Sequence, residues 1–326
     1  MSEKIKFIDF CSGIGGGRLG LELNGFKCIG FSEIDKSAIN TYKSFFNTKN
    51  ELEFGDLVKL EPKNLPNFDL LISGFPCQTF SIVGKRAGLN DEDKGKIIYH
   101  LAEILKTKQP KFFILENVKG LVNHDKGNTL KIILKILNKC GYNVKFEVLN
   151  TLDFGLAQSR ERIYFIGVRQ DLDFDIKLKN PKKQSKISDF LSPSKQNLIE
   201  KTSQKYQTFL KYLKNKYNCD RVKLDEILQK DDYTILDTRQ SDLRFYEDKI
   251  PTIRRDRQGI LYVYKGEIYS LSALEALKFQ GFDKVKNLKS KIDNLKEADI
   301  LRQCGNAMSV DVIASIAKEI KKAIYG

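Results

Sequence analysis

Residues 69–81 read Asp-Leu-Leu-Ile-Ser-Gly-Phe-Pro-Cys-Gln-Thr-Phe-Ser, the most informative stretch of this chain. The apolar run at 70–72 predicts a buried strand that ends at Gly74. Cys77 then lies just beyond the carboxyl end of a strand, where α/β proteins place their chemistry. Pro76 has a fixed φ angle and would hold the thiol on a stiff turn. The pattern is compatible with a nucleophilic thiolate, and also with a small buried core cysteine.

The chain has 326 residues, of which 41% are hydrophobic and 30% are charged, values typical of globular proteins. This length allows one large domain and a smaller one, each with its own core. No apolar stretch is long enough to cross a bilayer, and residues 1–4 lead directly into a strand-like segment. We therefore expect no secretory signal and a cytoplasmic location.

The six cysteines are scattered without paired spacing, which argues against a disulfide framework and against a zinc site. His100 and His124 are the only two histidines, so a histidine-based triad or metal centre is also not expected. We predict that the protein binds no metal.

The net charge is +14, from 56 lysines and arginines against 42 aspartates and glutamates. Such an excess suits a polyanionic partner, and nucleic acid is the first candidate. Lysine is abundant throughout, however, so a bias in composition would produce the same charge. Charge alone therefore leaves nucleic-acid binding open.

Strand and helix patterns alternate through the first part of the chain. A strand-like run at 5–10 leads into a glycine-rich turn at 12–17 and a helix at 18–24. A second strand, at 27–31, is followed by a helix that extends through Phe46. Further strands are predicted at 70–73, 112–115, 144–148 and 163–168, and further helices at 97–106 and 129–139. This alternation predicts an α/β fold in which helices cover both faces of a mostly parallel sheet.

The character of the sequence changes after Arg169. Residues 177–216 are polar with weak periodicity, and residues 230–269 carry short aromatic and β-branched runs typical of a small β-containing module. Helical periodicity returns at 272–279 and 311–323. We therefore predict a large α/β domain of residues 1–172 and 270–326, with a smaller domain, residues 173–269, inserted within it.

Three groups of residues are candidates for a site. The turn at 13–16 has the spacing Gly-x-Gly-Gly, which differs from the dinucleotide pattern G-x-G-x-x-G, and Glu33 follows the second strand, where it could accept hydrogen bonds from ribose hydroxyls. Glu116 follows the strand at 112–115, at the same sheet edge as Cys77. Arg160 and Arg162 precede the strand at 163–168 and would lie on one side of it. Each group alone is more often structural than functional.

In this order, the motifs resemble those of the DNA (cytosine-5)-methyltransferase family. The matching segments are F-I-D-F-C-S-G-I-G-G at 7–16, S-E-I-D at 32–35, G-D-L at 55–57, G-F-P-C-Q-T-F-S at 74–81, E-N-V at 116–118, Q-S-R-E-R at 158–162 and C-G-N-A-M at 304–308. They extend over the whole predicted large domain. The length and the inserted module are similar to those of bacterial restriction–modification methyltransferases, which implies the Rossmann-like fold of S-adenosylmethionine-dependent methyltransferases with an inserted target-recognition domain.

The resemblance implies a role for each catalytic residue. Cys77 would form a covalent adduct with carbon 6 of cytosine, because carbon 5 is a poor nucleophile until the ring becomes enamine-like. Glu116 would hold the ring at nitrogen 3, and Arg162 would contact the cytosine oxygen and orient Glu116. Arg160 would lie nearby on the sugar-phosphate side. A duplex buries the reacting edge of the base, so the cytosine would be flipped out, and the segment at 81–96 resembles the loop that closes over it.

The resemblance also implies S-adenosylmethionine as the cofactor. Its expected contacts are Phe10, Cys11, Gly13, Gly15, Glu33, Ile34, Asp56, Leu57, Pro76, Asn306 and Met308. Asp56 would accept a hydrogen bond from the adenine amino group. The family usually has an aromatic ring where this chain has Cys11, and often a tryptophan where it has Ile34. We therefore expect a less aromatic adenine pocket.

The inserted module would read the DNA sequence. The expected DNA contacts are Ser81, Lys85, Lys94, Arg239, Gln240, Arg244, Thr252, Arg254, Arg255 and Arg257. Arginine pairs well with guanine edges and glutamine with adenine, whereas other side chains hold phosphates. A solvated basic face is the alternative for these arginines.

Three other functions remain compatible with the sequence. A tRNA cytosine-5 methyltransferase would use the same scaffold and cysteine, but we expect it to have a smaller insert. A catalytically silent DNA-binding homologue would retain the fold, although Cys77, Glu116 and Arg162 are all present. An NAD-dependent Rossmann enzyme is disfavoured by the missing G-x-G-x-x-G. The preferred interpretation is a monomeric DNA methyltransferase that acts on double-stranded DNA, with a cognate restriction endonuclease acting separately.

Overall fold

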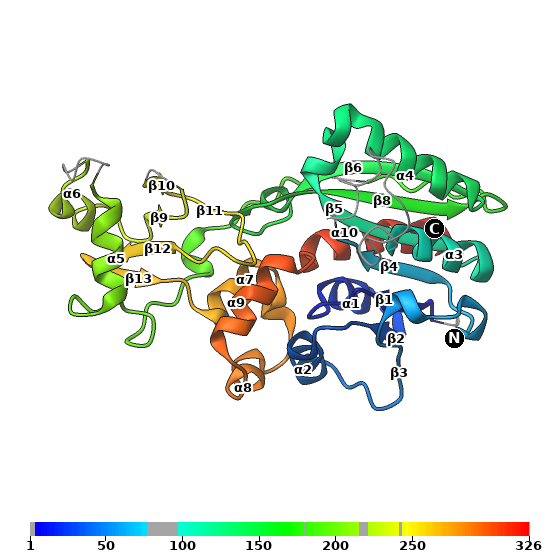
Figure 1. The fold of residues 1–326 in the computed structure, drawn as a ribbon, viewed down its shortest axis with the longest axis horizontal. Coiled ribbons are helices and arrows are strands. Elements are labelled where there is room, and N and C mark those ends of the chain that lie inside the picture. The colour runs from blue at the N-terminus through cyan, green and yellow to red at the C-terminus, as the bar shows by residue number, and fades with distance from the viewer. Residues whose placement is uncertain (1–3, 77–96, 179, 215–220, 241–242, 326) are drawn as a thin grey trace, which may run out of the picture. The chain divides into compact units, whose positions relative to one another are not determined.

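The computed structural model describes residues 4–76, 97–178, 180–214, 221–240 and 243–325. Its contacts divide the chain into two compact units. The first unit consists of Met1–Asn150, Glu161–Pro181 and Ala307–Gly326, and the second of Thr151–Arg160 and Lys182–Asn306. Figure 1 shows the helices and strands of each.

A seven-stranded sheet forms the centre of the first unit, with the strand order β3-β2-β1-β4-β5-β8-β6. Its strands are β1 (Lys6–Phe10), β2 (Lys27–Ser32), β3 (Leu52–Glu53), β4 (Leu70–Gly74), β5 (Phe112–Val118), β6 (Tyr142–Asn150) and β8 (Glu161–Arg169). Only β8 runs antiparallel to its neighbours, β5 and β6, among the strands of this sheet. The predicted α/β fold with a mostly parallel sheet is confirmed.

Helices cover both faces of this sheet, as the alternation along β4 shows. Leu71 packs into a core cluster together with residues of α3 (Ile97–Lys108) and α4 (Asn128–Lys139). The next residue, Ile72, approaches Gly17 of α1 (Gly16–Glu22), which packs on α10 (Val310–Tyr325). Since successive strand residues face opposite sides of a sheet, α3 and α1 lie on opposite faces. Helix α2 of the same unit spans Lys36–Phe45.

The second unit contains an antiparallel sheet with the order β10-β9-β12-β13 and a separate two-stranded parallel sheet formed by β7 and β11. The bounds are β7 (Gln158–Ser159), β9 (Ile235–Asp237), β10 (Arg244–Tyr246), β11 (Ile250–Pro251), β12 (Ile260–Tyr264) and β13 (Glu267–Ser270). The helices are α5 (Gln204–Tyr212), α6 (Leu224–Leu228), α7 (Ala273–Phe279), α8 (Leu288–Ile292) and α9 (Glu297–Asn306). A core of its own, which includes Phe209, Leu236 and Val263, holds this unit together.

The compact units have other boundaries than the domains predicted from the sequence. Residues 270–306 were predicted to continue the large domain, but by their contacts they belong to the second unit. One reason is the buried carboxylate of Glu275 in α7, which accepts hydrogen bonds from Tyr262 and Asn197. The helical pattern at 272–279 shows that this segment forms a helix, but not what the helix packs against. Its assignment to the catalytic domain stays a prediction about function.

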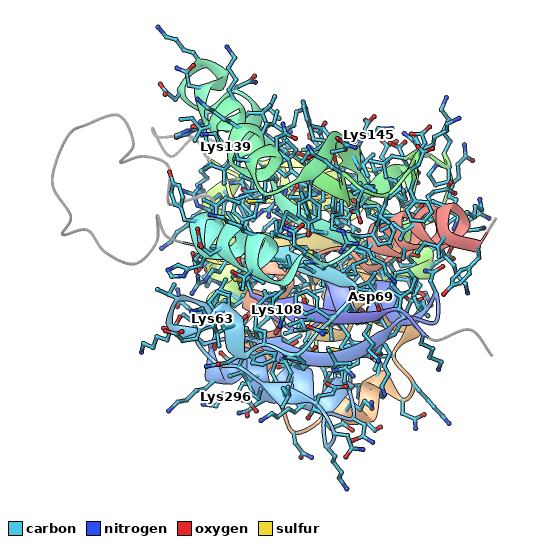
Figure 2. All side chains as sticks on the ribbon, turned by 90° about the vertical axis from the view of Figure 1, so that its right-hand side faces the viewer. Lys63, Asp69, Lys108, Lys139, Lys145 and Lys296 are labelled. Atoms are coloured by element: carbon cyan, nitrogen blue, oxygen red, sulfur yellow. The ribbon has the colours of Figure 1, made fainter. Side chains whose placement is uncertain are left out.

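Lysines lie on several elements of the first unit's surface, among them Lys63, Lys139 and Lys145 (Figure 2). Within the described residues, no helix is both long enough and apolar enough to cross a membrane.

Candidate active site and arginine hairpin

The glycine-rich turn joins β1 to α1 and leaves space above its backbone. Gly13 and Gly15 have φ angles of 54° and 83°, which favour glycine. A Cβ at Gly13 would meet no atom within 4 Å, so this position is open to a ligand. The Gly13 amide donates to Oε2 of Glu33 at 2.8 Å, and Oε1 of Glu33 accepts from the amides of Ile34 and Asp35. Glu33 is thus held at the end of β2, facing the turn.

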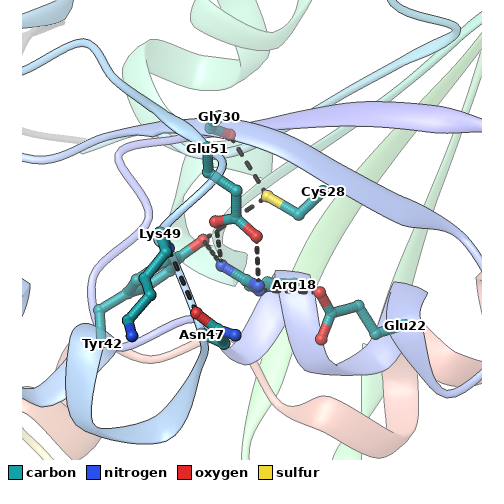
Figure 3. A network of polar contacts seen from close by, with 8 residues as sticks. All are labelled: Arg18, Glu22, Cys28, Gly30, Tyr42, Asn47, Lys49 and Glu51. Atoms are coloured by element: carbon teal, nitrogen blue, oxygen red, sulfur yellow. Dashed lines mark hydrogen bonds and ion pairs between the residues drawn. The ribbon is translucent and has the colours of Figure 1, made fainter.

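Arg18 fixes the helix that follows this turn (Figure 3). Its side chain is buried and donates to both carboxylate oxygens of Glu51, at 2.6 and 2.7 Å, and to Glu22 at 2.9 Å. It also donates to the hydroxyl of Tyr42 and lies over the ring of Phe46. Bidentate arginine–carboxylate pairs are geometrically specific. Arg18 therefore ties α1 to the segment that leads through β3 towards Asp56.

The other residues predicted to contact the cofactor have different environments. Asp56 is half-buried and its carboxylate accepts from the amide of Val58, capping a short 3₁₀ helix at Leu57–Lys59. Phe10 and Leu57 are buried in the core cluster with α3, which favours a structural role for both. Cys11 is half-buried and has a φ angle of 50°. Ile34 and Pro76 are exposed. Met308 is buried beside Gly74 in the first unit, whereas Asn306 ends α9 in the second.

Glu116 and Arg162 form an ion pair at the edge of the first unit's sheet. Glu116 lies inside β5 and Arg162 inside β8, because the ladder of these strands continues to the pair Val118 and Arg162. Both residues were predicted to flank strands, so the strands are longer than predicted. Arg162 lies diagonally across from Glu116 on the same face of the ladder. Its Nε is 3.1 Å from Oε1 of Glu116, whose side chain is 9% exposed.

The pair lies next to the strand that leads to Cys77. Glu116 is paired in register with Gly74 at the end of β4. A Cβ placed at Gly74 would be 3.5 Å from Oε2 of Glu116. Glu116 therefore shares a sheet edge with Gly74, three residues before Cys77. That it shares this edge with Cys77 itself stays a prediction. Cys77 itself, and the predicted DNA contacts Ser81, Lys85 and Lys94, lie outside the described residues.

Asn117 is a residue of this edge that the sequence analysis did not single out. It is buried, and its side-chain amide donates to the carbonyl of Phe75 at 2.9 Å. It thereby fixes the backbone two residues before Cys77. Its position inside the E-N-V motif was the available signal, since a buried asparagine needs hydrogen-bond partners.

Arg160 differs from Arg162 in its surroundings. It belongs to the second unit and is 1% exposed. Its guanidinium donates to the carbonyls of Ile253 and Gly305, at 3.2–3.3 Å. These contacts favour a positioning role over the catalytic role expected from the motif.

The arginines predicted to contact DNA fall into two classes. Arg239 is buried, and its guanidinium donates to both oxygens of Asp237 and to the carbonyl of Thr252. This geometry favours a structural role over base contact. Arg254, Arg255 and Arg257, by contrast, are exposed on a tight hairpin, hereafter the arginine hairpin (residues 252–259). A cavity of about 290 Å³ lies beside it, lined by Lys205, Phe209 and Leu261 among others. Arg244 is also exposed and Gln240 is half-buried.

Comparison with known proteins identifies the family. The model of the C-5 cytosine-specific DNA methylase family matches residues 5–322. The type II methyltransferase M.Bsp6I of Bacillus sp. (strain RFL6) is 33% identical over 327 residues, covering 96% of this chain and 97% of that protein. The type II methyltransferase M.NgoBI of Neisseria gonorrhoeae is 51% identical over 169 residues, 52% of each chain. The orphan methyltransferase M.SPRI of Bacillus phage SPR is 44% identical over 60% of this chain.

Several of these alignments are partial, and the chain spans about half the length of M.NgoBI and 44% of M.SPRI. Among solved structures, the methyltransferase EhMeth of Entamoeba histolytica superimposes with a TM-score of 0.70 at 21% identity, covering 99% of both chains. The predicted methyltransferase fold is thereby confirmed. Since the family model extends over nearly the whole chain, this protein belongs to the C-5 cytosine-specific DNA methylase family.

Proposed function

We propose that this protein transfers a methyl group from S-adenosylmethionine to carbon 5 of a cytosine in a specific double-stranded DNA sequence. The observation that carries the proposal is the pair of buried Glu116 with half-buried Arg162, in register with Gly74 at the end of β4, three residues before Cys77. A carboxylate and a guanidinium held together there match the polar edge of a cytosine.

Cys77 is the proposed nucleophile. Its thiolate attacks carbon 6 of the flipped cytosine, and the new bond makes carbon 5 electron-rich. Glu116 holds nitrogen 3 of the ring and shares a proton with it as the adduct forms. Arg162 donates to the cytosine oxygen while its Nε keeps Glu116 oriented at 3.1 Å. After methylation, a water molecule takes the proton from carbon 5, the double bond between carbons 5 and 6 re-forms, and the bond from carbon 6 to Cys77 breaks to release the product and the thiolate.

The residues around the glycine-rich turn fit the proposed cofactor. The space above Gly13 admits a ligand, and Glu33 presents carboxylate oxygens at the end of β2, where ribose hydroxyls would donate to them. Asp56 is half-buried at the neighbouring strand end and would accept from the adenine amino group. When bound, S-adenosylmethionine supplies the methyl group, as in the family as a whole.

DNA is the proposed partner, with base flipping as the way in which a duplex cytosine reaches Glu116 and Cys77. The exposed arginines of the hairpin and the net charge of +14 support it. Type II relatives support a place in a restriction–modification system, with a separate endonuclease as partner. We further propose that the protein acts as a monomer in the cytoplasm, where its DNA substrate lies.

A denaturing gel tests the chemistry. Duplex DNA in which 5-fluorocytosine replaces cytosine is incubated with the protein and S-adenosylmethionine. Fluorine at carbon 5 blocks the final elimination, so a covalent complex should accumulate and migrate slowly. The Cys77→Ala variant should give no such band. An adduct on tRNA but not on any duplex would assign the protein to RNA, and no adduct on either would leave a DNA-binding homologue without activity.

A further inference from the structure

The motif Q-S-R-E-R is divided between the two units of the protein. The boundary falls between Arg160 and Glu161. Glu161 and Arg162 belong to β8 of the first unit, where Arg162 forms an ion pair with Glu116. Gln158 and Ser159 form β7 in the second unit, directly followed by Arg160. The first half of the motif therefore has its own contacts, which the proposed chemistry does not use.

Gln158 and Arg160 hold both backbone polar groups of Ile253. Oε1 of Gln158 accepts from the Ile253 amide at 2.9 Å, and Arg160 donates to the Ile253 carbonyl at 3.3 Å. Gln158 and Arg160 are 0% and 1% exposed. Because they are two residues apart on an extended backbone, their side chains face the same side, and both form hydrogen bonds with Ile253. Ile253 is the second residue of the arginine hairpin.

The residues that lead into the arginine hairpin, in β11, and its first residue, Thr252, are also held by the segment at 158–160. Ile250 and Pro251 pair in parallel with Gln158 and Ser159. The hydroxyl of Thr252 donates to the Ser159 carbonyl at 2.6 Å. Each residue from 250 to 253 thus contacts the segment at 158–160, immediately before the exposed Arg254.

Gly305 supports the hairpin from another direction. Its carbonyl accepts two hydrogen bonds from Arg160. A Cβ at Gly305 would lie 2.2 Å from the Arg255 amide nitrogen and 2.5 Å from the Arg254 carbonyl carbon, so any larger residue would displace the hairpin backbone. The end of α9 therefore packs on the main chain of the two arginines.

We propose that Gln158, Arg160 and Gly305 form a clamp that positions the arginine hairpin, and that this clamp determines how strictly the enzyme discriminates between DNA sequences. Base edges are read only when donors are placed within hydrogen-bond geometry, whereas phosphate contacts tolerate displacement. Loosening the hairpin should therefore reduce sequence discrimination and largely preserve general DNA affinity. Arg160 is on this argument a positioning residue. The inference rests on the proposed function.

The test is the methylation pattern of Arg160→Lys. Purified protein methylates a plasmid library that contains every short sequence, and deamination sequencing reads the methylated positions. Lysine keeps the charge but cannot bridge two carbonyls with a planar fork. We expect the ratio of methylation at the preferred site to methylation at single-mismatch sites to fall roughly tenfold or more, in the range that one mismatched base pair costs. Gln158→Met, which removes the bond from the Ile253 amide and the bond to the Phe279 carbonyl without adding charge, should do the same.

The control is Asn197→Ala, which removes a buried amide from the same unit. Asn197 donates to Tyr262 and Glu275. This variant should lower the melting temperature without changing the methylated sequence. If Arg160→Lys and Gln158→Met methylate more slowly but keep the wild-type site preference, the clamp proposal is wrong and Arg160 acts on the chemistry. If the wild-type protein methylates no cytosine, the proposed function itself fails.

Discussion

The sheet edge of the first unit and the arginine hairpin of the second unit hold their functional side chains in opposite ways. At the sheet edge, strand ladders place Glu116 and Arg162, and the side chains then pair with one another. At the hairpin, little regular structure is present, and buried side chains such as Arg160 and Arg239 hold the backbone instead. The proposed catalytic pair is thus placed by main-chain pairing, whereas the proposed recognition hairpin is held by hydrogen bonds from buried side chains.

The largest effect that would test this comparison is expected at Glu116. Glu116→Gln keeps the size of the side chain but removes its charge and its capacity to exchange a proton. We expect kcat to fall about 10²- to 10⁴-fold, the usual contribution of a positioned acid or base. Steady-state methylation of duplex DNA measures it. Glu161→Gln is the matched control, because Glu161 bonds to Lys119 at the surface. Equal losses in both variants would contradict the assignment.

Arg239 and Arg254 test whether buried arginines of the second unit are structural. Arg239→Met leaves Asp237 buried without its partner, which should lower the free energy of unfolding by about 3–5 kcal/mol. Arg254→Met removes an exposed side chain and should change it by about 0.5 kcal/mol or less. Denaturant unfolding followed by circular dichroism compares them. A stable Arg239→Met protein with impaired DNA binding would instead favour base contact by Arg239.

The same ion pair predicts a dependence of stability on pH. Burial raises the pKa of Asp237, but hydrogen bonds from Arg239 outweigh it and hold this pKa below its usual value. In the unfolded chain an aspartate has a pKa of about 3.9. Because the pKa of Asp237 is lower in the folded protein, its carboxylate stabilises the fold at pH values above about 3.9. This stabilisation is lost as the pH falls through the pKa of the folded state. The melting temperature should therefore fall below about pH 4. Asp237→Asn should lose part of this dependence, whereas the exposed Asp256→Asn should keep it. An unchanged acid profile in Asp237→Asn would argue against the pair.

The smallest effect is expected at the glycine-rich turn. Burial raises the pKa of the Cys11 thiol to about 12, so Cys11→Phe removes no charge at neutral pH. An aromatic ring there would add stacking area for adenine, worth a few-fold to about tenfold in affinity for S-adenosylmethionine. Isothermal titration with the cofactor measures it. If the affinity stays the same, the aromatic ring expected at this position contributes nothing to the adenine pocket here.

The sequence was sufficient to predict most strands and helices of the first unit, because each carries a clear period and a turn signal at its end, but it missed the two-residue strand β3 and the full length of β5 and β8. For the same reason Gly13 could be assigned to a turn and Glu33 to the end of the second strand. The position of β8, which lies antiparallel between β5 and β6, could not be predicted, because apolar runs do not reveal which strands pair. That position is what brings Arg162 to Glu116.

Predictions for the second unit were weaker, because exposed and buried arginines look alike in a sequence. A signal for Arg239 did exist. Asp237 and Arg239 are two residues apart at the end of a strand, so their side chains face the same side and can pair. Arg254 and Arg255 have no acidic residue two positions before them, where Thr252 and Ile253 stand. Contacts of Gln158 and Arg160 with a residue almost a hundred positions away follow from tertiary packing alone.

The clamp on Ile253 has a consequence for how new target sequences arise. Gln158 and Arg160 hold an amide and a carbonyl, groups that almost every residue type provides. Exposed side chains at 254, 255 and 257 can therefore be exchanged without loss of the hydrogen bonds that aim them. Libraries that vary these three positions while retaining Gln158, Arg160 and Gly305 should yield folded enzymes with altered targets. On this proposal, the side chains that contact the DNA bases can change during evolution while the residues that hold the hairpin backbone stay the same.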